Sequence, residues 1–200
     1  MITLCMDTSN RFLVLALIKD DQVVGSVQED CFKMQSEAIF PKLNELMDAA
    51  GLKPMDIDQC VITDGPGSYT GVRIAMTVAK VMCAMRSLPL YTLGTLQLYA
   101  GKETCTVLLD ARGKRAYAAS FENGAAVTET KAVELTELQA EIPADRKVIG
   151  DGSLIGRSDY YPDLAKRFLE CRDAWKQAAN VHLVRTEYLK DSEAYLLKKK

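Results

Sequence analysis

One short glycine-rich segment, residues 64 to 74, constrains the fold of this 200-residue chain more than any other. It reads Asp-Gly-Pro-Gly-Ser-Tyr-Thr-Gly-Val-Arg-Ile and joins an apolar run at residues 60–63 to a stretch of helical periodicity at residues 68–86. Closely spaced glycine and proline make a tight turn, and Ser68 is a suitable N-cap for the helix that follows. The segment therefore predicts a strand, a tight turn and a helix in succession.

The backbone of this turn is a candidate binding site. Unpaired N–H groups at the positive end of a helix suit either an anion or the backbone of another protein. The turn is not a Walker A loop, because no Gly-Lys-Ser/Thr follows it. Gly71 is unfavourable inside a helix, so we expect it to allow a partner backbone or a nucleotide to approach closely. The alternative is a purely structural turn, in which Gly67 takes a positive φ and Gly71 tolerates alanine.

The chain repeats a pattern of strands that predicts two related lobes. In each copy an apolar strand ends in aspartate and a hairpin turn follows 13 residues later, from Asp7 to Asp20 and from Asp110 to Asn123. The predicted strands of the two copies cover residues 2–6, 12–18 and 22–27, and residues 106–109, 115–121 and 125–130. We assign residues 1–101 to the first lobe and residues 102–200 to a smaller second lobe.

Helices and further strands follow each group of three strands. In the first lobe a helix at residues 35–50, a strand at 60–63 and a helix at 68–86 complete a β-β-β-α-β-α unit, with a strand at 90–93 leading out of it. The second lobe is expected to hold a short helix near residues 135–141 and a strand at 147–149. The remaining tail carries little pattern, and the lysines at 198–200 suit either a solvated end or an RNA contact.

Composition narrows the class of protein. With 25 basic and 27 acidic residues the net charge is −2, so the chain lacks the positive field that would let it bind nucleic acid unaided. The six cysteines form no C-x-x-C pair and are expected to be buried thiols in a reducing cytoplasm. The longest apolar run, residues 12–18, is too short to span a membrane.

The second long helix, residues 68–86, carries more apolar surface than one sheet face needs. Its polar stripe past the first turn is narrow and is formed by Arg73, Thr77 and Lys80. A helix that covers a sheet requires only one apolar stripe. The excess must therefore be covered by the second lobe, by a neighbouring helix or by a partner.

Two loops are candidates for phosphate chemistry. Asp7, Thr8 and Ser9 form a turn like the phosphate turn of actin-like ATPases, although the same residues are ordinary turn formers. The matching segment after Asp110 keeps one glycine and has three basic residues, so the second half of such a site is degraded. The chain has a single histidine, which disfavours a metal centre, a Ser-His-Asp triad and a catalytic cysteine. We expect no catalytic residue.

Several segments in this order resemble the TsaB (YeaZ) family, which is required for threonylcarbamoyladenosine in tRNA. The segments are Leu4 to Ser9, Gln35 to Glu37, Gly65 to Ile74, Leu109 to Arg112, Gly150 to Gly152 and Glu187 to Leu189. The resemblance implies the fold of actin-like ATPases, Hsp70 and sugar kinases (ASKHA), with two related lobes, the second reduced. Gln35 stands where relatives often have histidine.

The resemblance implies a non-catalytic scaffold subunit that pairs with a TsaD-like catalytic subunit, with a TsaE-like ATPase as a third member. This chain is then expected to bind no cofactor alone, with ATP or ADP and a metal in the partner subunits, to reach tRNA only through the complex, and to form a homodimer in isolation. The expected contacts lie on the two long helices at Gln35, Ile39, Leu43, Leu46, Met47, Gly71, Arg73, Met76, Lys80 and Met82.

Two other functions stay open at this point. A stand-alone kinase or ATPase of the same fold would use Asp7, Thr8, Ser9 and Asp110 for phosphate and magnesium. A metallopeptidase is a weaker alternative, because the histidines that such a site needs are missing.

Overall fold

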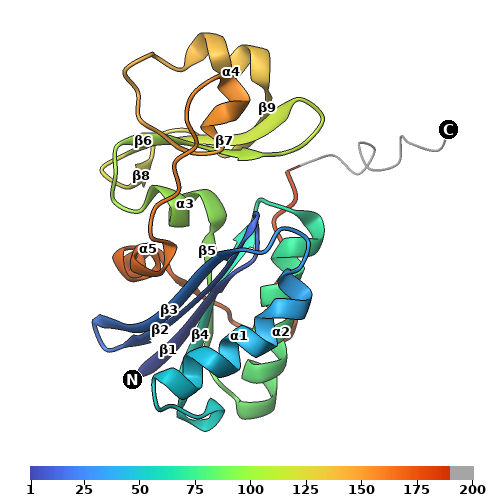
Figure 1. The fold of residues 1–200 in the computed structure, drawn as a ribbon, viewed down its shortest axis with the longest axis vertical. Helices are drawn as coiled ribbons and strands as arrows, with labels where there is room; N and C mark the ends of the chain where they lie inside the picture. Colours follow the sequence, from blue (N-terminus) through green and yellow to red (C-terminus); the bar gives the residue numbers. More distant parts are fainter. Residues whose placement is uncertain (190–200) are drawn as a thin grey trace, which may run out of the picture.

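The computed structural model describes residues 1–189, which form two α/β lobes, one above the other (Figure 1). The lysines at 198–200 lie outside the described residues. No helix within the described part of the chain has the length and apolar character needed to cross a membrane.

The first lobe is built on a six-stranded sheet with the order β11-β5-β4-β1-β2-β3. Its strands are β1 (Ile2–Asp7), β2 (Phe12–Lys19), β3 (Gln22–Asp30), β4 (Gln59–Gly65), β5 (Leu90–Gly94) and β11 (Lys176–Gln177). The first three strands are antiparallel, while β4 lies parallel to both β1 and β5. Because side chains alternate along a strand, Leu4 and Met6 pack into the core on one face of β1 and Cys5 into the core on the other.

Helices cover both faces of this sheet (Figure 1). One face carries α1 (Gln35–Ala49) and α2 (Tyr69–Arg86), and the other carries α3 (Thr95–Ala100) and α5 (Leu164–Glu170). The N-cap of α2 is Ser68, whose Oγ accepts from the N–H of Gly71 at 3.3 Å. Both long helices were predicted, and the buried face of α1 follows the predicted periodicity.

The second lobe repeats the same order in reduced form. Its strands are β6 (Cys105–Asp110), β7 (Arg115–Glu122), β8 (Ala125–Ala126), β9 (Lys131–Glu134) and β10 (Val148–Gly150), and its helix is α4 (Leu135–Glu141). The β6 strand pairs antiparallel with β7 and parallel with β10, as β1 pairs with β2 and β4. The chain therefore has the predicted ASKHA-type α/β fold, with a short second lobe.

The strand predicted at residues 125–130 is wrong in its extent. The chain leaves the ladder after Ala126 because the N–H of Ser120 on β7 donates to the side chain of Thr128, at 2.8 Å, instead of to a backbone carbonyl. Pairing resumes at Lys131 as the separate strand β9. The prediction that all cysteines are buried also needs correction, since Cys31 is half-buried while the other five are buried.

Residues 163–189 return to the first lobe, although the assignment of residues 102–200 placed them in the second. The α5 helix packs on β2 and β3, and β11 pairs with β5. Residues 178–189, which we call the C-terminal strap, then run along α2. The ammonium of Lys80 donates to the carbonyls of His182 and Val184, both at 3.0 Å. The ring of Tyr188 stacks on Tyr69 with 5.2 Å between centroids.

Candidate functional site

The side chain of Asp7 is buried at the end of β1, beneath the cleft between the lobes. Its Oδ1 accepts from the N–H of Ser9 at 3.0 Å and from the hydroxyl of Thr63. Its Oδ2 has no hydrogen-bond partner among the described residues. Burial raises the pKa of this carboxyl, and the hydrogen bonds from Ser9 and Thr63 oppose the rise only in part.

In Asp7→Asn, the free energy of unfolding should increase relative to that of wild type as the pH rises from 4 to 7. The raised pKa means that the folded chain keeps a proton on Asp7 where the unfolded chain has lost it, so this group lowers stability as pH increases. Urea unfolding of both proteins across this range tests the difference. Asp20→Asn is the control, because the N-terminal amine lowers the pKa of Asp20. The free energy of unfolding of this variant should decrease relative to that of wild type as the pH rises. A difference between Asp7→Asn and wild type that does not change with pH would contradict the argument.

The first turn of α2 fills the approach to the loop at residues 7–10. The hydroxyl of Thr8 donates to the carbonyl of Gly71 at 2.6 Å and accepts from the N–H of Ala75 at 3.1 Å. The N–H of Ser68 donates to the carbonyl of Ser9 at 2.7 Å. The hydroxyl of Thr8 is therefore bonded to the protein's own helix and is not free to bind a phosphate, whereas the hydroxyl of Ser9 and the amide nitrogen of Asn10 have no hydrogen-bond partner among the described residues.

The close approach predicted at Gly71 exists, but it is made by the same chain and not by a partner or a nucleotide. A Cβ at this position would lie far inside van der Waals contact with the carbonyl oxygen of Thr8. Gly67 is packed in the same way against the carbonyl of Ser9. The positive φ expected at Gly67 belongs instead to Gly65, at 119°. The glycines thus allow the two loops of the first lobe to touch.

The second candidate loop lies across the cleft and is exposed. Asp110 accepts from the N–H of Arg112 at 2.7 Å through its side chain, and its own N–H donates to Asp151 at 2.7 Å. Ser9 and Asp110 line one hollow of about 320 Å³, whereas Asp7 stays buried behind it. Within residues 1–189 no three His, Cys, Asp or Glu side chains are grouped to hold a metal ion.

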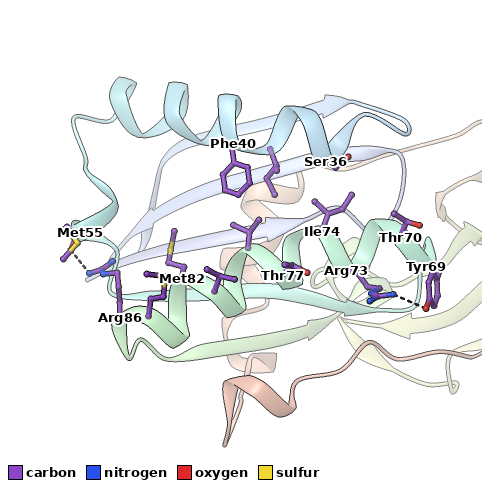
Figure 2. Close-up of a pocket in the computed structure, with 14 residues that line it drawn as sticks. Ser36, Phe40, Met55, Tyr69, Thr70, Arg73, Ile74, Thr77, Met82 and Arg86 are labelled. Carbon is purple, nitrogen blue, oxygen red and sulfur yellow. Dashed lines mark hydrogen bonds between the residues drawn. The ribbon is translucent and has the colours of Figure 1, made fainter.

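An open apolar groove of about 780 Å³ lies between α1 and α2 (Figure 2). Four of its aliphatic and phenyl side chains are unusually exposed for apolar residues: Phe40 by 57%, Met55 by 72%, Val81 by 53% and Met85 by 82%. Polar groups stand at its two ends. The guanidinium of Arg86 donates to the carbonyls of Met55 and Ile57 at one end, and that of Arg73 to the hydroxyl of Tyr69 at the other.

Most of the residues predicted to contact a partner face the sheet and not the solvent. Those with at most 7% of their surface exposed are Gln35, Ile39, Leu43, Leu46, Met47, Met76 and Gly71. Lys80 is engaged by the C-terminal strap. Met82 and Arg73 do line the groove, and Ile39, although buried, lies at its floor. The candidate surface therefore shifts by part of a helical turn, to Phe40, Ile74, Val78, Val81 and Met85.

The signal for these residues was present in the sequence. Phe40 on α1 is apolar at a position that helical periodicity turns away from the sheet, and Val81 on α2 is part of the apolar excess noted on the second helix. The sequence could not show which side of α2 faces the sheet, because apolar residues surround almost the whole helix.

The comparisons with known proteins agree with this architecture. The family profile of TsaD, tRNA N6-adenosine threonylcarbamoyltransferase, matches residues 15–144. The Bacillus subtilis protein named tRNA threonylcarbamoyladenosine biosynthesis protein TsaB is 30% identical over 127 residues, which cover 61% of this chain and 56% of that protein. The Escherichia coli TsaB protein is 29% identical over 177 residues, covering 82% of this chain and 74% of that protein. The chain thus spans about half to three quarters of these relatives.

Solved structures show the same fold. The structure of YeaZ from Pseudomonas aeruginosa superposes with a TM-score of 0.69 at 19% identity, covering 94% of this chain and 99% of that one. A second Pseudomonas aeruginosa structure, described as similar to peptidase YeaZ, gives a TM-score of 0.72 at 19% identity and the same coverage. The matched profile, the named relatives and the shared fold together establish that the chain belongs to the TsaB (YeaZ) family.

Proposed function

We propose that this chain is a cytoplasmic, non-catalytic subunit in the formation of N6-threonylcarbamoyladenosine in tRNA. In this proposal it binds a TsaD-type catalytic subunit through the groove between α1 and α2. The observation that carries the proposal is the groove itself, which leaves Phe40, Val81 and Met85 largely in solvent. Such contiguous apolar surface on a folded chain marks an interaction site.

The chemistry of the groove suits a protein partner. Its lining includes Met55, Met82 and Met85, and flexible thioethers adapt to a partner's side chains. Burying exposed apolar side chains of this size contributes about 1.5–3 kcal/mol each before ordering costs. The same face would pair two copies of the chain when the partner is absent. A TsaE-like ATPase would complete the complex, with ATP or ADP and a metal held by the partner subunits.

The rival function, a stand-alone kinase or ATPase, is less well supported by the geometry. The loop at residues 7–10 is closed by α2 through Thr8 and Ser9, and Asp7 is buried beneath it. Asp110 is exposed on the other side of the cleft, where it binds the N–H of Arg112. Of these four residues only Ser9 and Asp110 line the same hollow, and neither Asp7 nor Thr8 reaches it.

Reconstitution with a TsaD-type protein from the same source tests the proposal. We expect the two proteins to elute as one complex in size-exclusion chromatography. With the ATPase, threonylcarbamoyl-AMP and a tRNA transcript, modified adenosine should form only when this chain is present. The purified chain alone should hydrolyse no ATP. Magnesium-dependent ATP hydrolysis that is lost in Asp7→Ala, or modification that proceeds equally well without the chain, would overturn the proposal.

A further inference from the structure

We propose that a second surface, at the start of α2 beside the groove, binds the sugar-phosphate backbone of RNA. This surface, the basic rim, consists of Lys33, Arg73, Arg112 and Arg185 together with the stacked rings of Tyr69 and Tyr188. The inference rests on the proposed function, because it assigns to this chain a direct contact with the tRNA that the complex modifies.

Three adjoining hollows bring the basic rim together from four separate segments of the chain. The hollow of about 320 Å³ is lined by Lys33, Ser68 and Arg112. A smaller one of about 120 Å³ is lined by Ser68, Tyr69 and Arg112. The third, of about 510 Å³, is lined by Tyr69 and Arg73 with Arg185 and Tyr188 of the strap. Because each hollow shares residues with the next, they form one continuous edge around the first turn of α2.

The positive charge of this edge is not neutralised within the described part of the chain. None of the four cations makes an ion pair there, whereas the basic side chains Arg11, Arg167 and Arg172 elsewhere do. Among the described residues that line the three hollows the only acidic one is Asp110, and its side chain accepts from the N–H of Arg112. The chain as a whole carries −2, so unpaired positive charge gathered at one place indicates an anionic partner.

The aromatic groups favour RNA over an acidic protein segment. The rings of Tyr69 and Tyr188 stack at an interplanar angle of 26°, and the guanidinium of Arg73 lies 5.3 Å from the centroid of Tyr69. Nucleic-acid surfaces combine cations that follow the phosphates with flat groups on which bases stack. An acidic peptide has no counterpart for the second feature.

The position of the basic rim also suits the complex. Figure 2 shows Tyr69, Thr70 and Arg73 together at one end of the groove. These residues line both the groove and the hollows of the basic rim. A partner docked in the groove would therefore lie next to the basic rim, so one tRNA could contact both proteins.

Fluorescence anisotropy with a labelled, unmodified tRNA transcript tests the inference on the full chain. We expect measurable binding at low salt, and a variant with Lys33→Gln, Arg73→Gln, Arg112→Gln and Arg185→Gln should bind at least tenfold more weakly. Each phosphate contact contributes about 0.7–0.9 to the slope of log affinity against log salt, so the slope should fall by about 3–4 when all four cations are removed. A four-site control removes exposed lysines that line none of the hollows, Lys19, Lys53, Lys102 and Lys166.

Three results would overturn the inference. One is the absence of tRNA binding by the wild-type chain up to about 100 µM at low salt, the weak end of non-specific affinities. Another is an equal loss of affinity in the rim and control variants. The third is equally effective competition by polyglutamate and by polyuridylate of the same charge, which would assign the surface to an acidic protein segment. Complex formation with the TsaD-type partner tests the proposed function separately. It is measured in parallel with a variant that carries only Lys33→Gln, Arg112→Gln and Arg185→Gln, because Arg73 also lines the groove and stays in place there with Val81 and Met85.

Discussion

Replacing Val81 by glutamate should weaken binding to the TsaD-type partner at least about 100-fold while leaving the isolated chain folded. Val81 lines the groove and is 53% exposed, so the isolated chain can solvate the new carboxylate. In the complex the same charge would be buried without a partner, which costs several kcal/mol. Each 1.4 kcal/mol corresponds to a factor of about ten in the dissociation constant. Titration calorimetry of the two purified proteins measures the change.

A matched control separates this effect from a general effect of charge. Val127 is 52% exposed and lies on the second lobe, away from the groove, so Val127→Glu introduces the same change at the same exposure. We expect it to bind the partner within about twofold of wild type. Unaltered binding by Val81→Glu, with its fold confirmed by circular dichroism, would show that the partner docks elsewhere. Met76→Lys is a poor test, since Met76 is buried and the substitution would disturb the core.

Replacing Gly71 by alanine should destabilise the isolated chain by about 3 kcal/mol, although alanine is the better helix former. The new Cβ would overlap the carbonyl oxygen of Thr8, a backbone atom held by the β1 end of the sheet. Overpacking typically costs about 1–3 kcal/mol and occasionally more. Because this overlap is with a backbone atom that cannot rotate away, we expect a cost of about 4 kcal/mol, which a gain in helix propensity of about 1 reduces to a net loss of about 3. For a chain of this size the melting temperature should fall by roughly 6–12 °C. Calorimetry or denaturant unfolding measures the loss.

Gly94→Ala is the control for this prediction. Gly94 lies at the N-cap of α3 with φ −60°, and a Cβ there would meet its nearest neighbour, Gln97, at 3.9 Å. Replacing an N-cap glycine by alanine should cost only about 0.5 kcal/mol. A melting temperature of Gly71→Ala at or above that of wild type would contradict the prediction, because it would show that the loop at residues 7–10 can move to accommodate the new Cβ.

The parts of the fold that could be predicted are those whose signals are local. The helices α1 and α2 show clear apolar periodicity, and glycine, proline and Asn123-Gly124 mark the turns. Among the short helices α4 was predicted, but α3 and α5 were missed, because six or seven residues give so few turns that a helical period emerges in some of them and not in others. The return of the tail to the first sheet had no sequence signal, since it depends on pairing between segments more than 80 residues apart.

The sequence predicted that the second long helix carries an apolar surface not covered by the sheet, but it did not predict which side chains form that surface. The apolar excess on the second helix correctly indicated an unfilled surface, yet the side chains assigned to it were mostly those of the core. Lys80 illustrates the reason: on the sequence it is an exposed cation on a helix, but in the fold its ammonium binds two strap carbonyls. Every residue has the same backbone carbonyl, so the sequence of side chains cannot predict which carbonyls a lysine will bind.

The C-terminal strap also sets the order in which the first lobe can be completed during synthesis. The edge of β5 gains its partner β11, and α2 gains the carbonyls that bind Lys80, only when residues 176–184 have left the ribosome. Until then the nascent chain presents an open strand edge and an uncovered helix flank, the features that chaperones and proteases recognise. The sheet of the first lobe is thus begun by β1 and completed at its edge by β11 only after the strands of the second lobe have been translated.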